Sequence, residues 1–275
     1  MSLNQFVLHA IFIGIFNAVF ALAFVGVLIW NHARKKTSGT ALLLVVFIMV
    51  FINALANPLV YYFQASNPSS TAGGAFVVIF LVAYMLTNFF LYNFSNRHIF
   101  NDGPIVQNII NSLILVLTTI VTSIMSYEIA IGVENGIFIQ TFIQSATGVE
   151  LMLPSVNAGL ILYIPIFVGF QLRLILHICY ILIKERDADP VKRIALIFVL
   201  LSIFFMVCIS VLTFFFTIPD NGERVIQLLH AFGGIFTLLM IIFGYFGWVL
   251  PNWLKKRLQK RFGLEEDTLD IFPET

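Results

Sequence analysis

Seven long apolar runs, separated by short polar links, fill most of this chain of 275 residues. Each run reaches the ~20 residues with which an α-helix crosses a hydrocarbon core of about 30 Å. Backbone polar groups left unsatisfied in lipid are costly, so uninterrupted apolar runs of this length are expected to be helices. The pattern predicts an all-α membrane protein, a seven-transmembrane-helix bundle with spans at 7–30, 41–63, 75–95, 105–127, 155–183, 194–217 and 225–250.

Lysine and arginine are concentrated in every second link. Of the 15 basic residues, 13 lie in the first, third and fifth links or after the last span, and the intervening links hold almost none. Basic residues next to membrane spans are retained on the cytoplasmic side. The distribution predicts a multi-pass protein of the cell membrane with its N-terminus outside and its C-terminus in the cytoplasm. The 13 residues are Arg34, Lys35, Lys36, Arg97, Lys184, Arg186, Lys192, Arg193, Lys255, Lys256, Arg257, Lys260 and Arg261.

Composition agrees with a membrane environment. Hydrophobic residues make up 60% and charged residues 11% of the chain, whereas soluble proteins average about half and a quarter. The net charge of +1 says little about partners, because the predicted topology puts its two signs on opposite faces of the membrane. The basic residues are divided among short links beside a bilayer, which argues against nucleic acid and favours anionic lipid headgroups as their partner.

The fourth-to-fifth link, residues 128–154, is long enough to have structure of its own. It contains Asn135-Gly136 between two β-prone runs, 128–134 and 137–143. Asn-Gly is a strong hairpin signal because both residues accept positive φ. The link is therefore predicted to form an outer β-hairpin, with an irregular loop as the alternative.

The segment after the last span has its own pattern. Residues 1–250 form the predicted bundle, 251–263 a predicted amphipathic helix and 264–275 an acidic cytoplasmic tail. In the helix, Trp253 or Leu254, Leu258 and Phe262 recur at four- to five-residue spacing, and five basic residues fill the other faces. This pattern is typical of a helix lying in the inner interface against anionic lipid.

Polar residues fall near the predicted centre of most spans. If they face inward, they form a polar layer able to hold water or a small ligand; ordinary hydrogen bonds between helices are the alternative. The residues at this level are Asn17, Asn53, Tyr84, Thr118, Thr119, Gln171, Arg173 and Thr237.

Arg173 is the most informative of these residues. It lies about ten residues from the inner end of its span, which predicts a depth of roughly 15 Å. No other span has Asp or Glu at its middle, so the expected partners are amide side chains, carbonyls freed near Pro165, water or an anionic ligand. An ionisable residue inside the membrane is a functional-site hypothesis. The predicted ligand-binding residues are Arg173, Gln171, Asn53, Asn17, Tyr84, Thr237 and His177, the last one turn from Arg173.

Several functional classes lack the residues they need. No span contains lysine, so a retinal Schiff base has no attachment point. An enzyme requires a nucleophile, a metal set or an acid–base pair, and none of the usual motifs for these is present. The sequence therefore predicts no catalytic activity, no cofactor and no metal site.

The outline resembles two groups of seven-helix proteins. Asp189-Pro190-Val191-Lys192-Arg193 after the fifth span, and the exit through Trp253-Leu254 into a basic helix, resemble the N-terminal seven-helix sensor region of prokaryotic histidine kinases. The resemblance to G-protein-coupled receptors is looser, since Asn96-Arg97-His98 stands where those receptors have Asp-Arg-Tyr. No kinase or other output domain follows Phe262, so the resemblance implies a separate signalling partner.

Three functions remain open. The favoured one is an integral membrane receptor or sensor that binds a small ligand within the bundle and signals through a separate cytoplasmic or membrane partner. The alternatives are a small-molecule or ion transporter that uses the same polar layer, and a structural membrane subunit.

Overall fold

A computed structural model describes residues 5–66, 71–100, 102–132, 139–144, 149–154, 161–184, 189–216 and 223–263. These residues form eight α-helices, two of which continue directly into a short π-helical turn, and two strands. The α-helices are α1 (Gln5–Lys35), α2 (Ser38–Ser66), α3 (Thr71–Ser95), α4 (Pro104–Ile131), α5 (Ile161–Lys184), α6 (Pro190–Phe216), α7 (Glu223–Gly244) and α8 (Asn252–Phe262). The π-helical turns are η1 (Asn96–Phe100) after α3 and η3 (Tyr245–Val249) after α7.

Proline and glycine mark several helix ends. Pro104 and Pro190 are the first residues of α4 and α6, where the missing N–H of proline costs nothing and its fixed φ suits the helix. Gly132 follows α4 with φ 70°, a left-handed conformation that ends helices and favours glycine.

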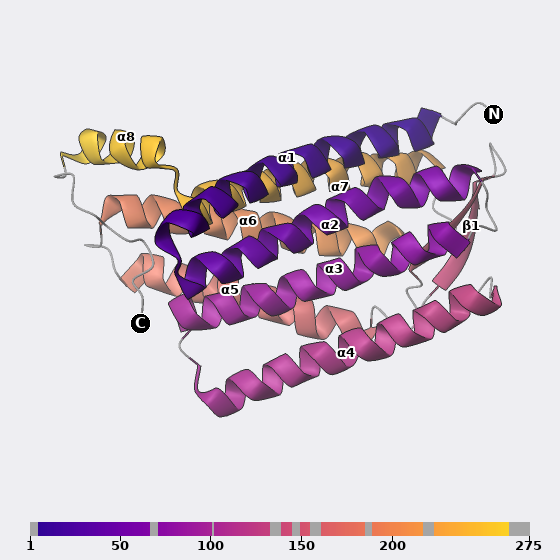
Figure 1. The fold of residues 1–275 in the computed structure, drawn as a ribbon, viewed down its shortest axis with the longest axis horizontal. Coiled ribbons are helices and arrows are strands. Elements are labelled where there is room, and N and C mark those ends of the chain that lie inside the picture. The colour runs from indigo at the N-terminus through magenta and orange to yellow at the C-terminus, as the bar shows by residue number, and fades with distance from the viewer. Residues whose placement is uncertain are drawn as a thin grey trace.

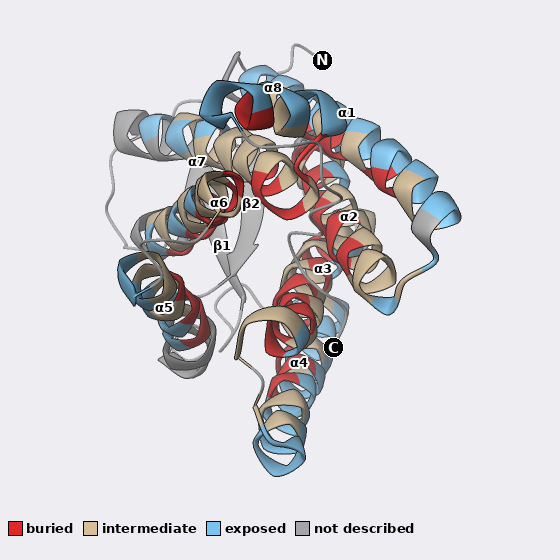
Figure 2. Ribbon diagram, turned by 90° about the vertical axis from the view of Figure 1, so that its left-hand side faces the viewer, coloured by how far each residue is buried: buried red, intermediate tan, exposed pale blue. Residues whose placement is uncertain are grey.

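Helices α1 to α7 run side by side (Figure 1), and each packs against the next in the chain except that α4 makes only slight contact with α5. Contacts between α1 and α7 close the ring (Figure 2). Within the described residues, α1, α2, α3 with η1, α4, α6 and α7 with η3 contain six stretches that are long and apolar enough to cross a membrane. The protein is therefore a multi-pass membrane bundle of helices. Part of the predicted fifth span, residues 155–160, lies outside the described residues.

The two ends of the bundle differ in composition. The C-terminal ends of α1 and α5, the N-terminal end of α6, and α8 lie together at one end, while the start of α1 and the strands lie at the other (Figure 1). The first end carries Arg34, Lys184, Lys192, Arg193 and the basic residues of α8. We call it the basic end.

The outer link is built differently from the prediction. Strands β1 (Ile139–Gln144) and β2 (Val149–Pro154) pair antiparallel, with Ile139 opposite Pro154. The run predicted as the first strand starts inside α4, because that helix continues to Ile131. The predicted turn at Asn135-Gly136 precedes β1 and lies outside the described residues. The first predicted strand was therefore wrong, whereas the second, 137–143, overlaps β1, whose pairing partner is β2.

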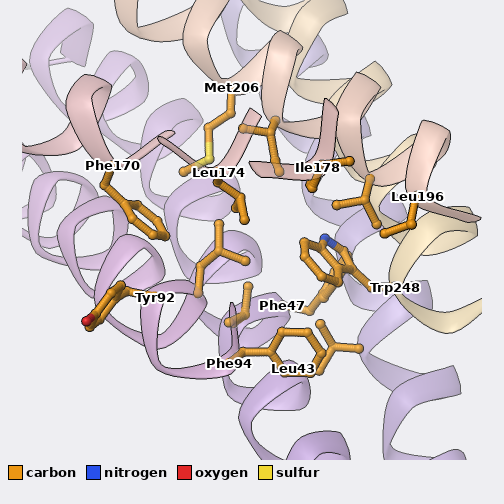
Figure 3. Close-up of a cluster of buried hydrophobic side chains, with 14 of the residues drawn as sticks. Leu43, Phe47, Tyr92, Phe94, Phe170, Leu174, Ile178, Leu196, Met206 and Trp248 are labelled. Atoms are coloured by element: carbon orange, nitrogen blue, oxygen red, sulfur yellow. The ribbon is translucent and has the colours of Figure 1, made fainter. Parts of the chain in front are cut away.

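The largest apolar cluster lies in the half of the bundle nearer the basic end. It joins α1, α2, α3, α5, α6 and η3 through buried side chains (Figure 3). Trp248 of η3 packs edge-on against Phe94 of α3, with 5.1 Å between ring centroids. This cluster fixes the positions of α3, α5 and α6 relative to one another.

Polar side chains hold α4 against α3. The amides of Asn93 and Asn111 donate to each other at 3.0 Å in both directions, and Gln107 Nε2 donates to Asn93 Oδ1 at 3.3 Å. An amide pair of this kind supplies specific contact where both helices otherwise present apolar surface.

Candidate functional site

Arg173 has an acidic partner, contrary to the sequence prediction. Its Nη1 donates to Asp102 Oδ2 at 3.0 Å, and its Nη2 donates to Asp102 Oδ1 at 2.6 Å. This two-pronged geometry is the strongest form of an arginine–carboxylate contact. Asp102 lies between η1 and α4, so the ion pair joins the α3–α4 link to α5.

Arg173 reaches Asp102 because the helices do not end at a common level. Arg173 contacts the link where α3 and η1 end and α4 begins, whereas α5 continues to Lys184. At 1.5 Å per residue, α5 extends about 16 Å beyond Arg173. Arg173 therefore lies level with the link and not at the centre of the bundle, and 43% of its side chain is exposed.

Aromatic and amide side chains complete the surroundings of the ion pair. Tyr92 of α3 donates its hydroxyl to Asp102 Oδ2 at 3.0 Å, and the Asp102 backbone N–H donates to Asn96 Oδ1 at 2.6 Å. The Arg173 guanidinium lies over the ring of Phe100, with Cζ 4.3 Å from the centroid. Each side of the Asp102 carboxylate thus has a donor, which fixes its orientation.

The ion pair changes the electrostatics of Asp102. The hydrogen bond from Arg173 lowers the pKa of this carboxyl below its ordinary value, with the Tyr92 hydroxyl acting in the same direction and partial burial opposing both. Only 11% of the Asp102 side chain is exposed, compared with 43% for Arg173. Asp102 is therefore ionised at neutral pH. Because its carboxylate is the more buried of the two groups, losing the partner charge is more costly for Asp102 than for Arg173.

His177 lies on the same helix, one turn after Arg173. Its ring meets the edge of Phe100 with 5.2 Å between centroids. It is close enough to favour the ionised form of Asp102. His177 therefore borders the ion pair.

A second polar cluster joins α3, α5 and α6. Gln171 Nε2 donates to Asn88 Oδ1 at 3.1 Å and approaches the Tyr84 hydroxyl at 3.5 Å. That hydroxyl lies 2.6 Å from Ser210 Oγ of α6. Gln171 and Asn88 are fully buried. Gln171 Oε1 is buried with no hydrogen-bond partner among the described residues.

The other predicted residues lie apart from this cluster. Asn17 donates to the Gly234 carbonyl of α7 at 3.1 Å, and Asn53 donates to the Phe80 carbonyl of α3 at 2.8 Å. Thr237 donates to a carbonyl of its own helix, as do Thr118 and Thr119. Of the predicted layer, the structure brings together Tyr84 and Gln171, with Arg173 and His177 at a neighbouring site.

Sequence reasoning missed six members of these clusters: Asn88, Tyr92, Asn96, Phe100, Asp102 and Ser210. Two signals were available. Tyr84, Asn88 and Tyr92 recur at four-residue spacing, which places their polar groups along one face of a helix. Asp102 is the one acidic residue in the basic third link, where it is an obvious partner for a nearby arginine.

The sequence matches no model of a known protein family, and no curated protein matches it.

Proposed function

We propose that the protein is a membrane receptor or sensor, in which a small ligand shifts α5 relative to α3 and the basic end passes the change to a separate partner. The observation that carries this proposal is the ion pair between Asp102 and Arg173. It connects α5 to the α3–α4 link about three turns before α5 ends at Lys184.

Both polar clusters connect α5 to α3 or to the link that follows α3. On α5, Gln171 and Arg173 are two residues apart, and on α3, Asn88 and Tyr92 are one turn apart. Gln171 bonds to Asn88, while Arg173 and Tyr92 share Asp102. A movement of α5 along α3 therefore strains both sets of contacts at once. This supports transmission from the bundle interior to the basic end.

The cost of opening the ion pair is suited to a switch. Arg173 is substantially exposed, and exposed ion pairs contribute only about 1 kcal/mol or less. Coupling between ligand sites in proteins is typically about 1–3 kcal/mol. A ligand with that preference for the open arrangement is sufficient to release Asp102 from Arg173.

A transporter is the alternative. The interior polar groups of Asn17, Asn53 and Tyr84 are engaged with neighbouring helices, which favours a role in helix packing over the lining of a polar path.

The proposed orientation, with the basic end in the cytoplasm, follows from retention of basic residues on that side. The resemblance to kinase sensor regions is consistent with a separate signalling partner.

Two measurements on the purified protein test the proposal. A thermal-shift screen identifies stabilising small molecules, and the same molecules are then tested for flux into liposomes. A sensor is expected to give stabilisation without flux. Flux that Arg173→Ala abolishes would contradict the proposal in favour of a transporter, and neither stabilisation nor flux would favour a structural subunit.

The coupling is tested with spin labels on the α3–α4 link and α5. A stabilising molecule is expected to lengthen the distance between the two spin labels in the wild type. Asp102→Asn is expected to lengthen the same distance without any ligand. Arg34→Gln is the matched control, because it removes a basic side chain at the same end whose described contact is the Trp30 ring. An unchanged distance in Asp102→Asn would show that the ion pair does not hold the link.

A further inference from the structure

Exposed aromatic rings accompany basic side chains at the basic end. Arg34 lies over the ring of Trp30 on α1, with Cζ 4.5 Å from the centroid. Lys184 lies near the ring of Tyr180 on α5, with Nζ 5.3 Å from the centroid. Both rings are exposed. Tryptophan and tyrosine with this exposure are typical of the level where lipid headgroups meet the acyl chains.

One face of α8 is docked on the bundle. Leu258 is buried with Val191 and Ala195 of α6 and Leu250 of the preceding turn, and Leu254 packs against the same cluster. Leu254 and Leu258 are four residues apart and therefore share one helix face. This docking fixes which side of α8 points away from the bundle.

The opposite face of α8 combines tryptophan with positive charge. Trp253, Lys256, Arg257 and Lys260 follow i, i+3, i+4, i+7 spacing, which puts them on one stripe, and Arg261 extends it. All five side chains are exposed, and Trp253 is 59% exposed. No Asp or Glu occurs between 252 and 263, so the helix itself contributes no negative charge to the stripe. We call these five residues the α8 stripe.

We propose that the α8 stripe binds the anionic headgroups of the lipid leaflet at the basic end. The charges complement phosphate groups, and Trp253 beside them supplies the amphipathic ring that inserts at the headgroup level. Because Trp30 and Tyr180 on two bundle helices present the same chemistry at the same end, the lipid surface lies within reach of α8. An acidic protein surface would match the charges but would leave the exposed rings of α1 and α5 without a common explanation.

The consequence concerns α6. Since α8 is docked on the first turns of α6, lipid binding to the stripe holds that helix end as well. The inference does not depend on the proposed ligand, and a protein without sensor activity would still bind lipid in this way.

The test uses the full chain in two kinds of nanodisc, one of phosphatidylcholine and one with roughly a third phosphatidylglycerol. Hydrogen exchange is measured in 252–262, together with quenching of Trp253 by brominated lipid, taking Trp253→Phe as the blank. Anionic lipid is expected to slow exchange about tenfold or more and to increase quenching. High salt is expected to reduce both effects.

Variants of α8 distinguish the effect of losing charge from the effect of losing the docked helix. Lys256→Gln, Arg257→Gln, Lys260→Gln and Arg261→Gln combined are expected to abolish the lipid dependence, while Lys256→Arg with Lys260→Arg retains it. Unchanged exchange in α6 in the phosphatidylcholine nanodisc shows that the glutamine variant remains docked. Equal exchange of wild-type α8 in both nanodiscs overturns the proposal. Protection by a soluble polyglutamate peptide, without any effect of anionic lipid, would overturn it in favour of an acidic protein partner.

Discussion

Two contacts between helices show opposite ways of building this bundle. Where η3 meets α6, the backbones nearly touch: a Cβ atom added to Gly247 would lie 2.5 Å from the backbone nitrogen of Val199. Where α3 and the link after it meet α5, hydrogen bonds and an ion pair contribute, through Asn88 with Gln171 and Asp102 with Arg173. Close packing admits one arrangement, whereas polar pairs can be exchanged for other partners at modest cost. The first contact is suited to holding the bundle together and the second to movement.

The largest effect is expected at the close contact. Gly247→Ala forces η3 away from α6, and such overpacking costs about 1–3 kcal/mol. Gly26→Ala is the control, because nothing lies within 4 Å of the added Cβ at that position. Thermal unfolding in detergent should show a clear loss for the first variant and none for the second. Equal melting temperatures would mean that this contact is less rigid than the packing implies.

A smaller effect is expected within the buried amide pair. Asn88→Ala leaves the buried Gln171 amide group without its main acceptor. The cost is expected towards the lower end of about 1–3 kcal/mol, because Gln171 Nε2 also lies 3.5 Å from the Tyr84 hydroxyl. Gln171→Leu removes that donor together with the unpartnered Oε1 and is expected to cost less. Thermal unfolding of both variants checks the order. The reverse order would show that Gln171 Oε1 has a partner in the folded protein.

A double-mutant cycle measures the ion pair. Arg173→Gln and Asp102→Asn are each expected to destabilise by about 1 kcal/mol, because the pair is partly exposed. The double variant should lose less than the sum, since either change alone removes the interaction. Additive losses in the unfolding free energy would indicate that the two side chains act independently.

The smallest effect is the dependence on pH. The pKa of Asp102 is lowered in the folded protein, so its stabilisation is present above the ordinary carboxyl value of 3.8 and is lost as pH falls through the lower folded value. The stability gap between the wild type and Asp102→Asn should therefore be constant near neutral pH and close on acidification. A gap that widens below 3.8 would contradict this assignment.

The sequence predicted best those features that depend on one helix alone. Apolar runs predicted the membrane helices, because length and hydrophobicity are local properties. The partner of Arg173 was missed because depth was measured from the end of its own span, while the true level depends on how far α5 projects past its neighbours. Asp102 was not considered as a partner because it lies in a link, outside every predicted span. Relative helix height is a tertiary property that a span prediction does not contain.

The candidate site divides in the same way. Tyr84 and Gln171 were found because polar residues inside apolar runs are conspicuous, and the structure brings them together. Asn88 and Tyr92 lie away from the midpoint of their span, so a prediction based on midpoints did not include them. The hairpin signal at Asn135-Gly136 misled because α4 extends to Ile131 and takes up the run expected to pair.

Each π-helical turn sets the rotational phase of the chain segment after it. A π turn bonds i to i+5 and so holds one more residue than an α-turn. Tyr245–Val249 therefore shifts the helical phase between α7 and the chain that leads into α8. Deleting one residue there would allow a regular α-helix to form and would rotate the next segment by about 100°. One additional residue at the end of α7 thus sets the phase at which the chain enters the Leu250–Pro251 turn before α8.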